Sequence, residues 1–561
     1  MEPSQTAIDY LVTSLTKKSF PGDTAGLLHN LVYYTPRIRS RRQLVRIVGA
    51  ILHSPLWNVA PEASLAVYDM AQAIFEWKLQ VSEPLIPVGE FYHVWDQAVE
   101  GCSSWSLAHL AILAGILTTR DRFEQLQAVA FVDDSGAVSG LYARWRRERF
   151  VPIWTQMVAR NLANTVVINH LSLLYSTVHA EGDSGMPWDV LAHSLFELAM
   201  QHIKTPGEAT FVARHLNKIA GALRSALPHT PAATVSKVLG RLCQVTFELS
   251  TAELNNGALH GYSAKRYSDT LFTVVLLLQG CLSHRAAAAQ WYHQTMVSLF
   301  FLNFIAQDFG TVGFEAYQYV YELSLTGVTA SFSGLSHCYD VMRGNVWPVR
   351  ENKANDSRAL FMLAFMERAL PLVPLPRDFV DSAVTPTVTE YIHSPCRALM
   401  ETAHTVQLSL FANTVSDSRL TQWKLHNLQP YIELSTGQFL GGKLSSKQLL
   451  LVFQTVAHQF PYLSAAHKDL SRELLHYTYL QILNCGSQDK KSTLVECLMH
   501  QLWFVNARHL VDWLDTCLEL IGTCPDKEPL LDELWDIVAN AKSDTARHWW
   551  YSRVLPVQSK L

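Results

Sequence analysis

The last three residues, Ser559, Lys560 and Leu561, have the chemistry of a recognition tag. A small hydroxyl residue, a cation and a leucine with a terminal carboxylate give a receptor three different handles. Amide donors can bind the carboxylate, acids the ammonium and an apolar pocket the leucine. Ser-Lys-Leu at a C-terminus is a peroxisomal address that a receptor reads. We therefore expect these residues to target the chain to peroxisomes, with an accidental tail as the alternative.

The residues before this tail predict how it is presented. Trp549, Trp550 and Val554 indicate a last packed helix, and Pro556 should end that helix. The remaining residues would then be extended, and five extended residues reach about 17 Å. That length is enough to enter a receptor.

A second address is conceivable between Arg46 and His53. Arg46 and Ile47 are followed, after five residues, by His53, which resembles the N-terminal type of peroxisomal signal. The last position of that pattern is usually apolar, but here it is Ser54. Ile47 and Ile51 are one helical turn apart, so the same residues predict a plain amphipathic helix. We favour this structural interpretation and keep a targeting signal at Arg46, Ile47 and His53 as the alternative.

The segment from Gly437 to Lys443 fits the spacing Gly-x-x-x-x-Gly-Lys of a phosphate-binding loop. The next position of such a loop needs Ser or Thr to hold Mg²⁺, but Leu444 stands there and Ser445 comes one residue too late. The motif should also follow a buried strand, whereas the flanking sequence is helical on both sides. We therefore predict a helix–loop–helix junction.

Other patterns of catalysis or metal binding are incomplete. The segment Gly334–Cys338 lacks the last glycine of a nucleophile elbow. His284 and His293 flank an alanine-rich turn without a third ligand at metal spacing. We therefore expect no catalytic, cofactor-binding or metal-binding residues.

Two arginine clusters stand out in a chain whose net charge is only −4. That balance gives no electrostatic reason to expect nucleic-acid binding. We interpret both clusters as solvated faces, with an acidic partner or lipid headgroups as the alternative. The clusters are Arg37, Arg39, Arg41 and Arg42, and Arg144, Arg146, Arg147 and Arg149.

Helical periodicity dominates the chain and predicts an all-α fold. Apolar residues recur at helical spacing in segments of roughly 12 to 20 residues, separated by Pro, Gly and Ser. Adjacent pairs would repeat at about 35 to 45 residues, as in two-helix solenoids, although no repeat consensus is visible. We predict an irregular HEAT-like array, with a small hairpin or loop insertion near 128–142 around Asp133-Asp134-Ser135-Gly136. The predicted division is 1–355, 356–555 and a tail at 556–561, with exposed connections at 354–357 and 371–378.

Composition supports a large core and a reducing compartment. Apolar residues make up 49% of the 561 residues and charged residues 17%, which argues against disorder. The nine cysteines are scattered, so a disulfide framework is not expected. The N-terminus has no secretory pattern. The most apolar run, 271–278, is too short to span a bilayer and predicts a buried helix.

Several segments, in collinear order along nearly the whole chain, resemble the yeast peroxisomal biogenesis factor 8 (peroxin-8) family. Residues 200–290 resemble it least. The resembling segments are 31–37 (LVYYTPR), 77–84 (WKLQVSEP), 310–314 (GTVGF), 319–321 (YVY), 438–439 (QF), 442–445 (GKLS), 495–498 (VECL), 549–551 (WWY) and the Ser-Lys-Leu tail.

This resemblance implies a peripheral protein on the lumenal face of the peroxisomal membrane. Family members bind the cycling receptor for C-terminal targeting signals, bridge the docking complex and the RING-finger ubiquitin-ligase complex, and are implicated in cargo release. The family has no catalytic residues, and its targeting residues correspond to Ser559, Lys560 and Leu561. Some members also use an Arg-apolar-x5-His signal, from which this chain departs at Ser54.

Three functions therefore compete. The first is a matrix-protein import factor that binds the receptor through more than its tail. The second is a peroxisomal matrix enzyme on a helical fold, which would need a cofactor pocket or a cluster of titratable groups. The third is a cytosolic helical-repeat adaptor with an accidental tail. The resemblance along the whole chain favours the first.

Overall fold

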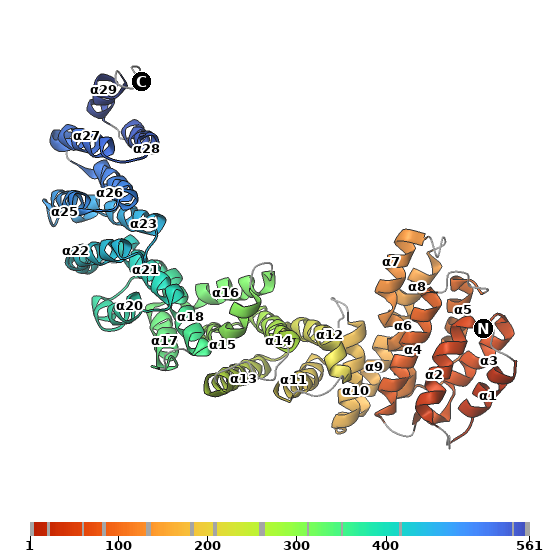
Figure 1. Ribbon diagram of the computed structural model, residues 1–561. Helices are drawn as coiled ribbons and strands as arrows, with labels where there is room; N and C mark the ends of the chain where they lie inside the picture. Colours follow the sequence, from red (N-terminus) through yellow and green to blue (C-terminus); the bar gives the residue numbers. More distant parts are fainter. Residues whose placement is uncertain are drawn as a thin grey trace. The chain divides into compact units, whose positions relative to one another are not determined.

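The structure is a computed structural model that describes residues 5–18, 23–58, 61–80, 86–130, 136–179, 185–205, 210–256, 264–310, 314–348, 352–413, 418–505, 507–540 and 543–555. Throughout these residues the regular elements are helices, which confirms the predicted all-α helical array (Figure 1). The chain forms two compact units, residues 1–324 and 325–561.

The helices of the first unit pack in two layers. In one layer α2, α4, α6, α10, α12 and α14 follow one another, each against the next, while α1, α3, α5, α11, α13 and α15 belong to the other layer (Figure 1). The bounds are α1 Gln5–Leu15, α2 Thr24–Tyr34, α3 Arg41–Leu52, α4 Ala63–Gln80, α5 Val88–Glu100, α6 Leu107–Thr118, α7 Arg120–Ala130, α8 Ala137–Arg144, α9 Val151–Arg160, α10 Thr165–Val178, α11 Trp188–Lys204, α12 Phe211–Ala226, α13 Ala232–Asn256, α14 Ala264–Leu282, α15 Ala289–Phe309 and α16 Glu315–Val328. Shorter turns are η1 Thr35–Arg37, η2 Pro55–Asn58, η3 Trp145–Phe150 and η4 Leu227–His229.

The second unit repeats this two-layer plan. Helices α18, α21, α23, α26 and α28 follow one another in one layer, with α17, α20, α22, α25, α27 and α29 against them. The bounds are α17 Phe332–Gly344, α18 Lys353–Ala369, α19 Arg377–Phe379, α20 Thr385–Ile392, α21 Arg397–Ala412, α22 Ser418–Leu440, α23 Ser446–Ala457, α24 Phe460–Leu463, α25 Leu470–Asn484, α26 Gln488–Gln501, α27 Ala507–Gly522, α28 Lys527–Asn540 and α29 Asp544–Arg553. Shorter turns are η5 Leu370–Leu372, η6 Val380–Val384 and η7 Leu502–Phe504.

The apolar stripe of each helix forms the core. The predicted buried run lies in α14, where Val274, Val275 and Leu277 are fully buried. Among the described residues, no helix combines the length and the apolar character that a membrane span needs. All nine cysteines are free thiols, as the scattered spacing predicts.

Glycines mark the closest helix contacts within the first unit. A Cβ on Gly115 of α6 would lie 2.5 Å from the Tyr68 carbonyl oxygen of α4. A Cβ on Gly280 of α14 would lie 2.8 Å from the Arg224 backbone of α12. At both positions only glycine fits, because the neighbouring atoms belong to a helix backbone and cannot rotate away.

Buried cations bind carbonyl groups of neighbouring loops. The Lys78 ammonium donates to the Ile86 carbonyl at 2.7 Å, and the Lys424 ammonium donates to the Asn413 carbonyl at 2.7 Å. The Arg358 guanidinium donates to the Asn345 carbonyl at 2.9 Å. These carbonyls would otherwise be left without a partner in the interior. Burial lowers the pKa of Lys78 and that of Lys424 to about 8.

Two expectations about connections need correction. Of the predicted hairpin or loop insertion near 128–142, the described residues do not form the hairpin, because 128–130 end α7 and 137–142 belong to α8, which begins after Gly136 at φ 65°. The loop alternative stays a prediction. Residues 131–135 lie outside the described residues. The segment Ala354–Ser357, predicted to be exposed, is buried in the first turn of α18. There Asn355 accepts a hydrogen bond from the Trp347 amide and donates one to the Trp347 carbonyl, each at 2.7 Å.

The predicted ranges 1–355 and 356–555 stay a prediction. Their boundary lies in the first turn of α18, whereas the two compact units meet at 324/325 within α16.

Candidate functional site

The predicted last packed helix is α29, and it anchors the base of the tail. Trp549 and Trp550 are each only 4% exposed, and Val554 is also buried. The Trp549 indole donates to the Asp515 carboxylate of α27 at 2.8 Å, and the Trp550 ring packs on the Trp535 ring of α28 with centroids 5.1 Å apart. Helix α29 is therefore held by both preceding helices, with its C-terminal end leading into the tail.

The tail itself, including Pro556 and the predicted targeting residues Ser559, Lys560 and Leu561, lies outside the described residues. Its role stays a prediction from the sequence. The described chain supplies the folded base from which the tail leaves, which is the last turn of α29 followed by Val554 and Leu555.

The alternative signal at Arg46, Ile47 and His53 is folded into the first unit. Arg46 pairs with Asp9 of α1 at 3.0 Å, and Ile47 is fully buried. His53 caps the end of α3, and the next residue, Ser54, is buried with its hydroxyl donating to the Leu15 carbonyl at 2.8 Å. Burial in the core thus explains why residue 47 of the pattern is apolar. A targeting role of Arg46, Ile47 and His53 stays a prediction.

The segment Gly437–Lys443 is a helix–loop–helix junction, as predicted. Helix α22 ends at Leu440, and Gly442 at φ 77° reverses the chain, with the Lys443 amide donating to the Gln438 carbonyl at 2.8 Å. Ser445 then caps α23 by a reciprocal pair of hydrogen bonds with Gln448. The glycines therefore serve a helix end, and Leu444 is buried in the core.

The incomplete catalytic patterns lie in ordinary helical surroundings. Gly334–Cys338 belongs to α17, and Gly334 donates its amide to Ser331, which caps that helix. His284 bonds the Thr230 carbonyl through Nε2 at 3.0 Å. Among the described residues, His, Cys, Asp and Glu do not gather in a group that could hold a metal ion.

The second arginine cluster is largely structural. The Arg144 guanidinium bonds both oxygens of Asp96, a buried carboxylate of α5 that also accepts from the Trp145 indole at 2.7 Å. Arg146 donates to the Val178 carbonyl at 3.1 Å. These contacts tie α8 and η3 to α5 and α10, so half of this cluster is used inside the fold.

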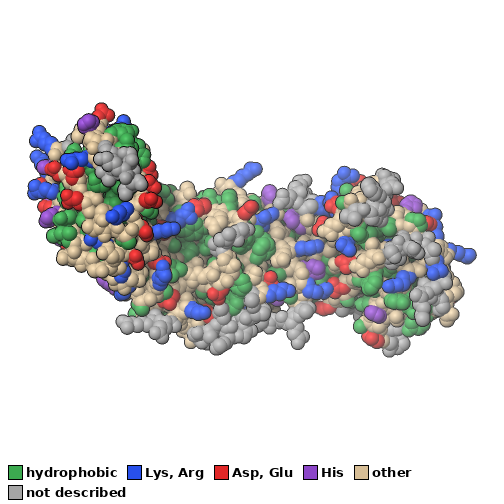
Figure 2. All heavy atoms as spheres, turned by 45° about the horizontal axis from the view of Figure 1, so that its top comes forward, with side chains coloured by type: hydrophobic (Ala, Val, Ile, Leu, Met, Phe, Trp, Pro, Cys, Tyr) green, Lys and Arg blue, Asp and Glu red, His purple; other side chains and the backbone are tan. Residues whose placement is uncertain are grey.

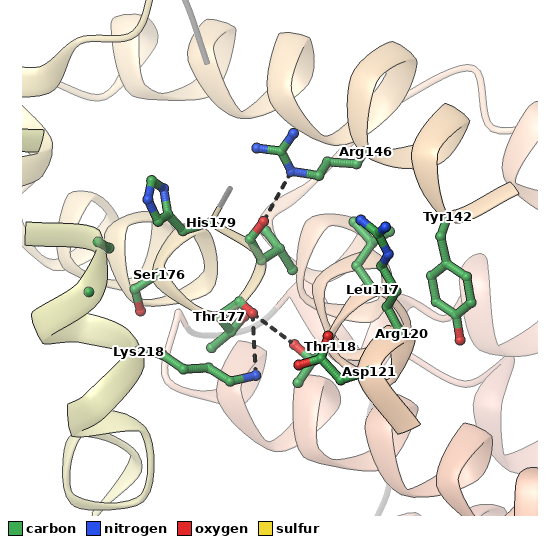
Figure 3. A pocket seen from close by; sticks show the side chains of 13 residues that line it. Leu117, Thr118, Arg120, Asp121, Tyr142, Arg146, Ser176, Thr177, His179 and Lys218 are labelled. Carbon is green, nitrogen blue, oxygen red and sulfur yellow. Dashed lines mark hydrogen bonds between the residues drawn. The ribbon is translucent and has the colours of Figure 1, made fainter. Parts of the chain in front are cut away.

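A cavity of about 270 Å³ lies between α6, α7, α10 and α12 (Figure 3). Its cations have structural partners: Arg146 bonds the Val178 carbonyl, and Lys218 bonds the Thr177 carbonyl at 3.5 Å. Both carbonyls belong to the last turn of α10, which carries the negative end of the helix dipole. Burial lowers the pKa of Lys218 below its ordinary value. Two of the cations that line the cavity thus cap a helix end, and a third, Arg120, bonds Glu124 at 2.7 Å.

The first arginine cluster faces solvent together with two aromatic rings. Arg37 Cζ lies 4.3 Å from the centroid of the Tyr33 ring and 5.0 Å from that of the Trp77 ring. Tyr33 is 38% exposed and Trp77 is 45% exposed. The arginines of this cluster are evident from the sequence, but the neighbouring rings are not. Tyr33 is one helical turn before Arg37 and could have been linked to it, whereas Trp77 reaches the cluster only through the packing of α4 on η1.

Comparison with known proteins shows one family along the chain. The PEX8 helical domain matches residues 192–316, and the PEX8 C-terminal domain matches residues 422–561. Peroxisomal biogenesis factor 8 of Saccharomyces cerevisiae is 29% identical over 98% of this chain and 99% of its own length. The chain is thus similar to the PEX8 family along nearly its whole length. Peroxisomal biogenesis factor 8 of Pichia angusta is 24% identical over 99% of this chain and 95% of its own length.

A further relative, named peroxisomal membrane protein PEX17, from Yarrowia lipolytica, is 20% identical over 99% of this chain and 98% of its own length. The first two relatives carry the name of a peroxisomal biogenesis factor. The PEX8 C-terminal domain extends from α22 through α29 to Leu561, so it includes both the folded base and the predicted address.

Proposed function

We propose that this chain is a peripheral protein on the lumenal side of the peroxisomal membrane that binds the cycling receptor for C-terminal targeting signals. The observation that carries the proposal is the Ser559-Lys560-Leu561 tail, which comes after a last helix, α29, that ends at Arg553 and is held by α27 and α28. Five residues reach about 17 Å when extended, so the residues after this anchored helix are long enough to enter the peptide pocket of a receptor.

The folded array provides a second contact with the same receptor. A matrix cargo needs only its tail, whereas a machine component of this size also offers a large helical surface, to which an amphipathic helix of a partner can bind. Two linked weak contacts strengthen overall binding by roughly 10²–10⁴ when both can form at once. The tethered tail then competes locally for the receptor pocket and assists the release of cargo.

The array also bridges the docking complex and the RING-finger ubiquitin-ligase complex of the membrane. This can be tested by affinity isolation from solubilised peroxisomal membranes, with the full chain and with a version lacking residues 559–561. We expect the full chain to recover the receptor and both complexes, and the shortened chain to keep both complexes. Recovery of neither complex by either version would overturn the bridging role.

Location is tested separately on intact organelles. Carbonate should extract the protein, and protease should reach it only after the membrane is opened. Retention in the carbonate pellet would contradict peripheral association.

The alternative signal is tested in the chain that lacks residues 559–561. We expect the added substitutions Arg46→Gln and His53→Gln to leave its residual import unchanged, since Ile47, the apolar member of the pattern, is fully buried. A further loss of import caused by these two substitutions would establish Arg46–His53 as a working second address.

A further inference from the structure

The surface at the base of the tail carries exposed apolar side chains of α28 and α29. The Trp535 ring of α28 packs on the Tyr551 ring of α29, with the two centroids 6.0 Å apart. Val554 keeps helical backbone angles, and its amide bonds the Trp550 carbonyl at 2.9 Å. Leu555 therefore lies one helical turn after Tyr551, on the same face of the helix. We call Trp535, Tyr551 and Leu555 the tail-base patch.

The tail-base patch stays in solvent although α29 is packed on its neighbours. Helix α29 is held on α27 and α28 with Trp549 and Trp550 buried. By contrast, Tyr551 is 56% exposed, Leu555 is 48% exposed and Trp535 is partly exposed. Figure 2 shows hydrophobic side chains at the surface of this end of the second unit, among charged ones. Single exposed apolar side chains are ordinary, but a group that includes two aromatic rings indicates a contact surface.

The length of chain beyond Leu555 indicates which partner reaches the patch. Four residue steps join Leu555 to Ser559, and they span at most about 14 Å. A receptor pocket that holds Ser559, Lys560 and Leu561 must therefore lie within about that distance of Leu555. A folded domain of only 100 residues has a radius of gyration of about 13 Å, so the domain around the pocket is broader than this gap. Its surface is therefore brought to the end of α29, where the patch lies.

The three tail residues alone offer little contact area to a receptor. Stable protein interfaces typically involve about 20–30 residues and bury about 800 Å² on each partner, far more than three residues supply. Tyr and Trp are among the side chains that most often dominate the binding energy of such interfaces. The tail-base patch supplies one of each, together with a leucine that immediately precedes Pro556, the first residue of the tail.

We propose that the tail-base patch is a contact surface for the receptor domain that binds the tail. The tail occupies the pocket of that domain, and Trp535, Tyr551 and Leu555 pack on an apolar part of the pocket's rim. This inference rests on the proposed recognition of the tail by the receptor, and it extends the recognised surface from three residues to the folded base. The chain then binds the domain more tightly than a cargo that ends in the same three residues, which favours its competition for the pocket.

The test titrates the purified peptide-binding domain of the receptor against the purified full chain and its variants, by calorimetry. The patch variant carries Tyr551→Ser and Leu555→Ser, and Trp535 is left in place because it also packs on Trp550. Each of the two side chains has about half of its surface left to bury, which corresponds to roughly fivefold in affinity. We therefore expect the patch variant to bind the domain about 25-fold more weakly than the unmodified chain.

The matched control carries Tyr462→Ser and Leu483→Ser, two side chains of the same unit that are 67% and 55% exposed. They lie on α24 and α25, which precede α27, α28 and α29 along the array (Figure 1). This control should bind the domain like the unmodified chain, and so should the conservative variant Tyr551→Phe, Leu555→Met. Thermal melting checks the fold of each variant. Hydroxyl-radical footprinting of the unmodified chain needs no variant: the domain should protect Tyr551 and Leu555 from oxidation but not Tyr462.

Equal affinities of the patch variant and the control, with binding lost when residues 559–561 are removed, would overturn this inference alone. Unprotected Tyr551 and Leu555 in the complex would do the same. If the unmodified chain does not bind the domain at all, the proposed recognition of the tail is wrong, and this inference with it. Self-association that only the patch variant loses, at unchanged affinity for the domain, would assign the patch to a second copy of the chain. Protection of the patch by phosphatidylcholine vesicles and not by the domain would assign it to a lipid surface.

Discussion

The substitution Gly115→Ala tests the close packing of α6 on α4. A Cβ at this position would lie 2.5 Å from the Tyr68 carbonyl oxygen, 2.9 Å from the Gln72 amide nitrogen and 3.0 Å from the Ala71 Cβ. Ordinary contacts of a Cβ are 3.4–4 Å, so the two helices would have to separate. Two of the three atoms belong to the α4 backbone, which cannot move without disturbing its own hydrogen bonds.

Two opposing effects decide whether Gly115→Ala raises or lowers the free energy of unfolding. Replacing a helical glycine by alanine stabilises a helix by about 1 kcal/mol, because the unfolded chain loses less freedom. Overpacking a tight contact costs about 1–3 kcal/mol, and rigid backbone on the other side places this site near the upper end. We therefore expect Gly115→Ala to lower the free energy of unfolding of the first unit by about 2 kcal/mol.

Gly240→Ala is the matched control. Gly240 lies inside α13, and no atom lies within 4 Å of the position of its Cβ, so this change should stabilise by up to about 1 kcal/mol. Urea midpoints and hydrogen exchange of the α4 and α6 amides measure both variants, since long helical arrays can open in parts. A Gly115→Ala protein as stable as the Gly240→Ala protein would refute the packing argument.

Three further predictions concern charge and binding. Lys78 has a pKa of about 8 in the fold and about 10.4 when unfolded. Between these pH values the unfolded chain binds more protons than the folded chain, so the free energy of unfolding rises with pH by at most about 3 kcal/mol. The substitution Lys78→Met should flatten this rise in thermal melts from pH 7.5 to 9.5. Burial lowers the pKa of His215 to about 4, so the unfolded chain binds more protons than the folded chain as the pH drops from about 6.5 to 4, and the free energy of unfolding should fall. This fall should be smaller in the His215→Phe variant. Equal dependence of stability on acid pH in the two proteins would contradict this prediction. Lys443→Ala should leave import unchanged, and calorimetry should detect no ATP binding in the unmodified chain; ATP binding lost in the variant would refute the helix-end interpretation.

Helical periodicity predicted the fold well where apolar residues alone define an element. The apolar run 271–278 lies in α14, and the last packed helix predicted from Trp549, Trp550 and Val554 is α29. In both cases the local sequence contains the signal, because the apolar spacing of a helix depends on neighbours in sequence.

The failures occurred where specific tertiary hydrogen bonds decide the local structure. Ala354–Ser357 looks polar and exposed, but hydrogen bonds between Asn355 and the Trp347 backbone allow it to be buried. The alternation near 128–142 resembled a hairpin, but the residues after Gly136 form α8, with Tyr142 bonded to Tyr92 from α5. Partners some 50 positions away cannot be read from local pattern.

The candidate site was predicted in part. Trp549, Trp550 and Val554 gave the packed base of the tail from their residue types alone. The contact between Arg37 and Trp77 depends on the packing of α4 against η1, so the sequence indicated the charge of the first arginine cluster but not the rings beside it.

The central claim is that receptor binding uses both the tail and the folded array. The most direct test titrates purified receptor against the full chain and against the chain lacking residues 559–561, with the receptor's peptide pocket open or blocked. The account predicts that the shortened chain still binds, with roughly 10²–10⁴-fold lower affinity, and that blocking the pocket no longer affects it. If removal of Ser559, Lys560 and Leu561 abolishes all binding, the protein is only cargo to the receptor, and its proposed role in release is wrong.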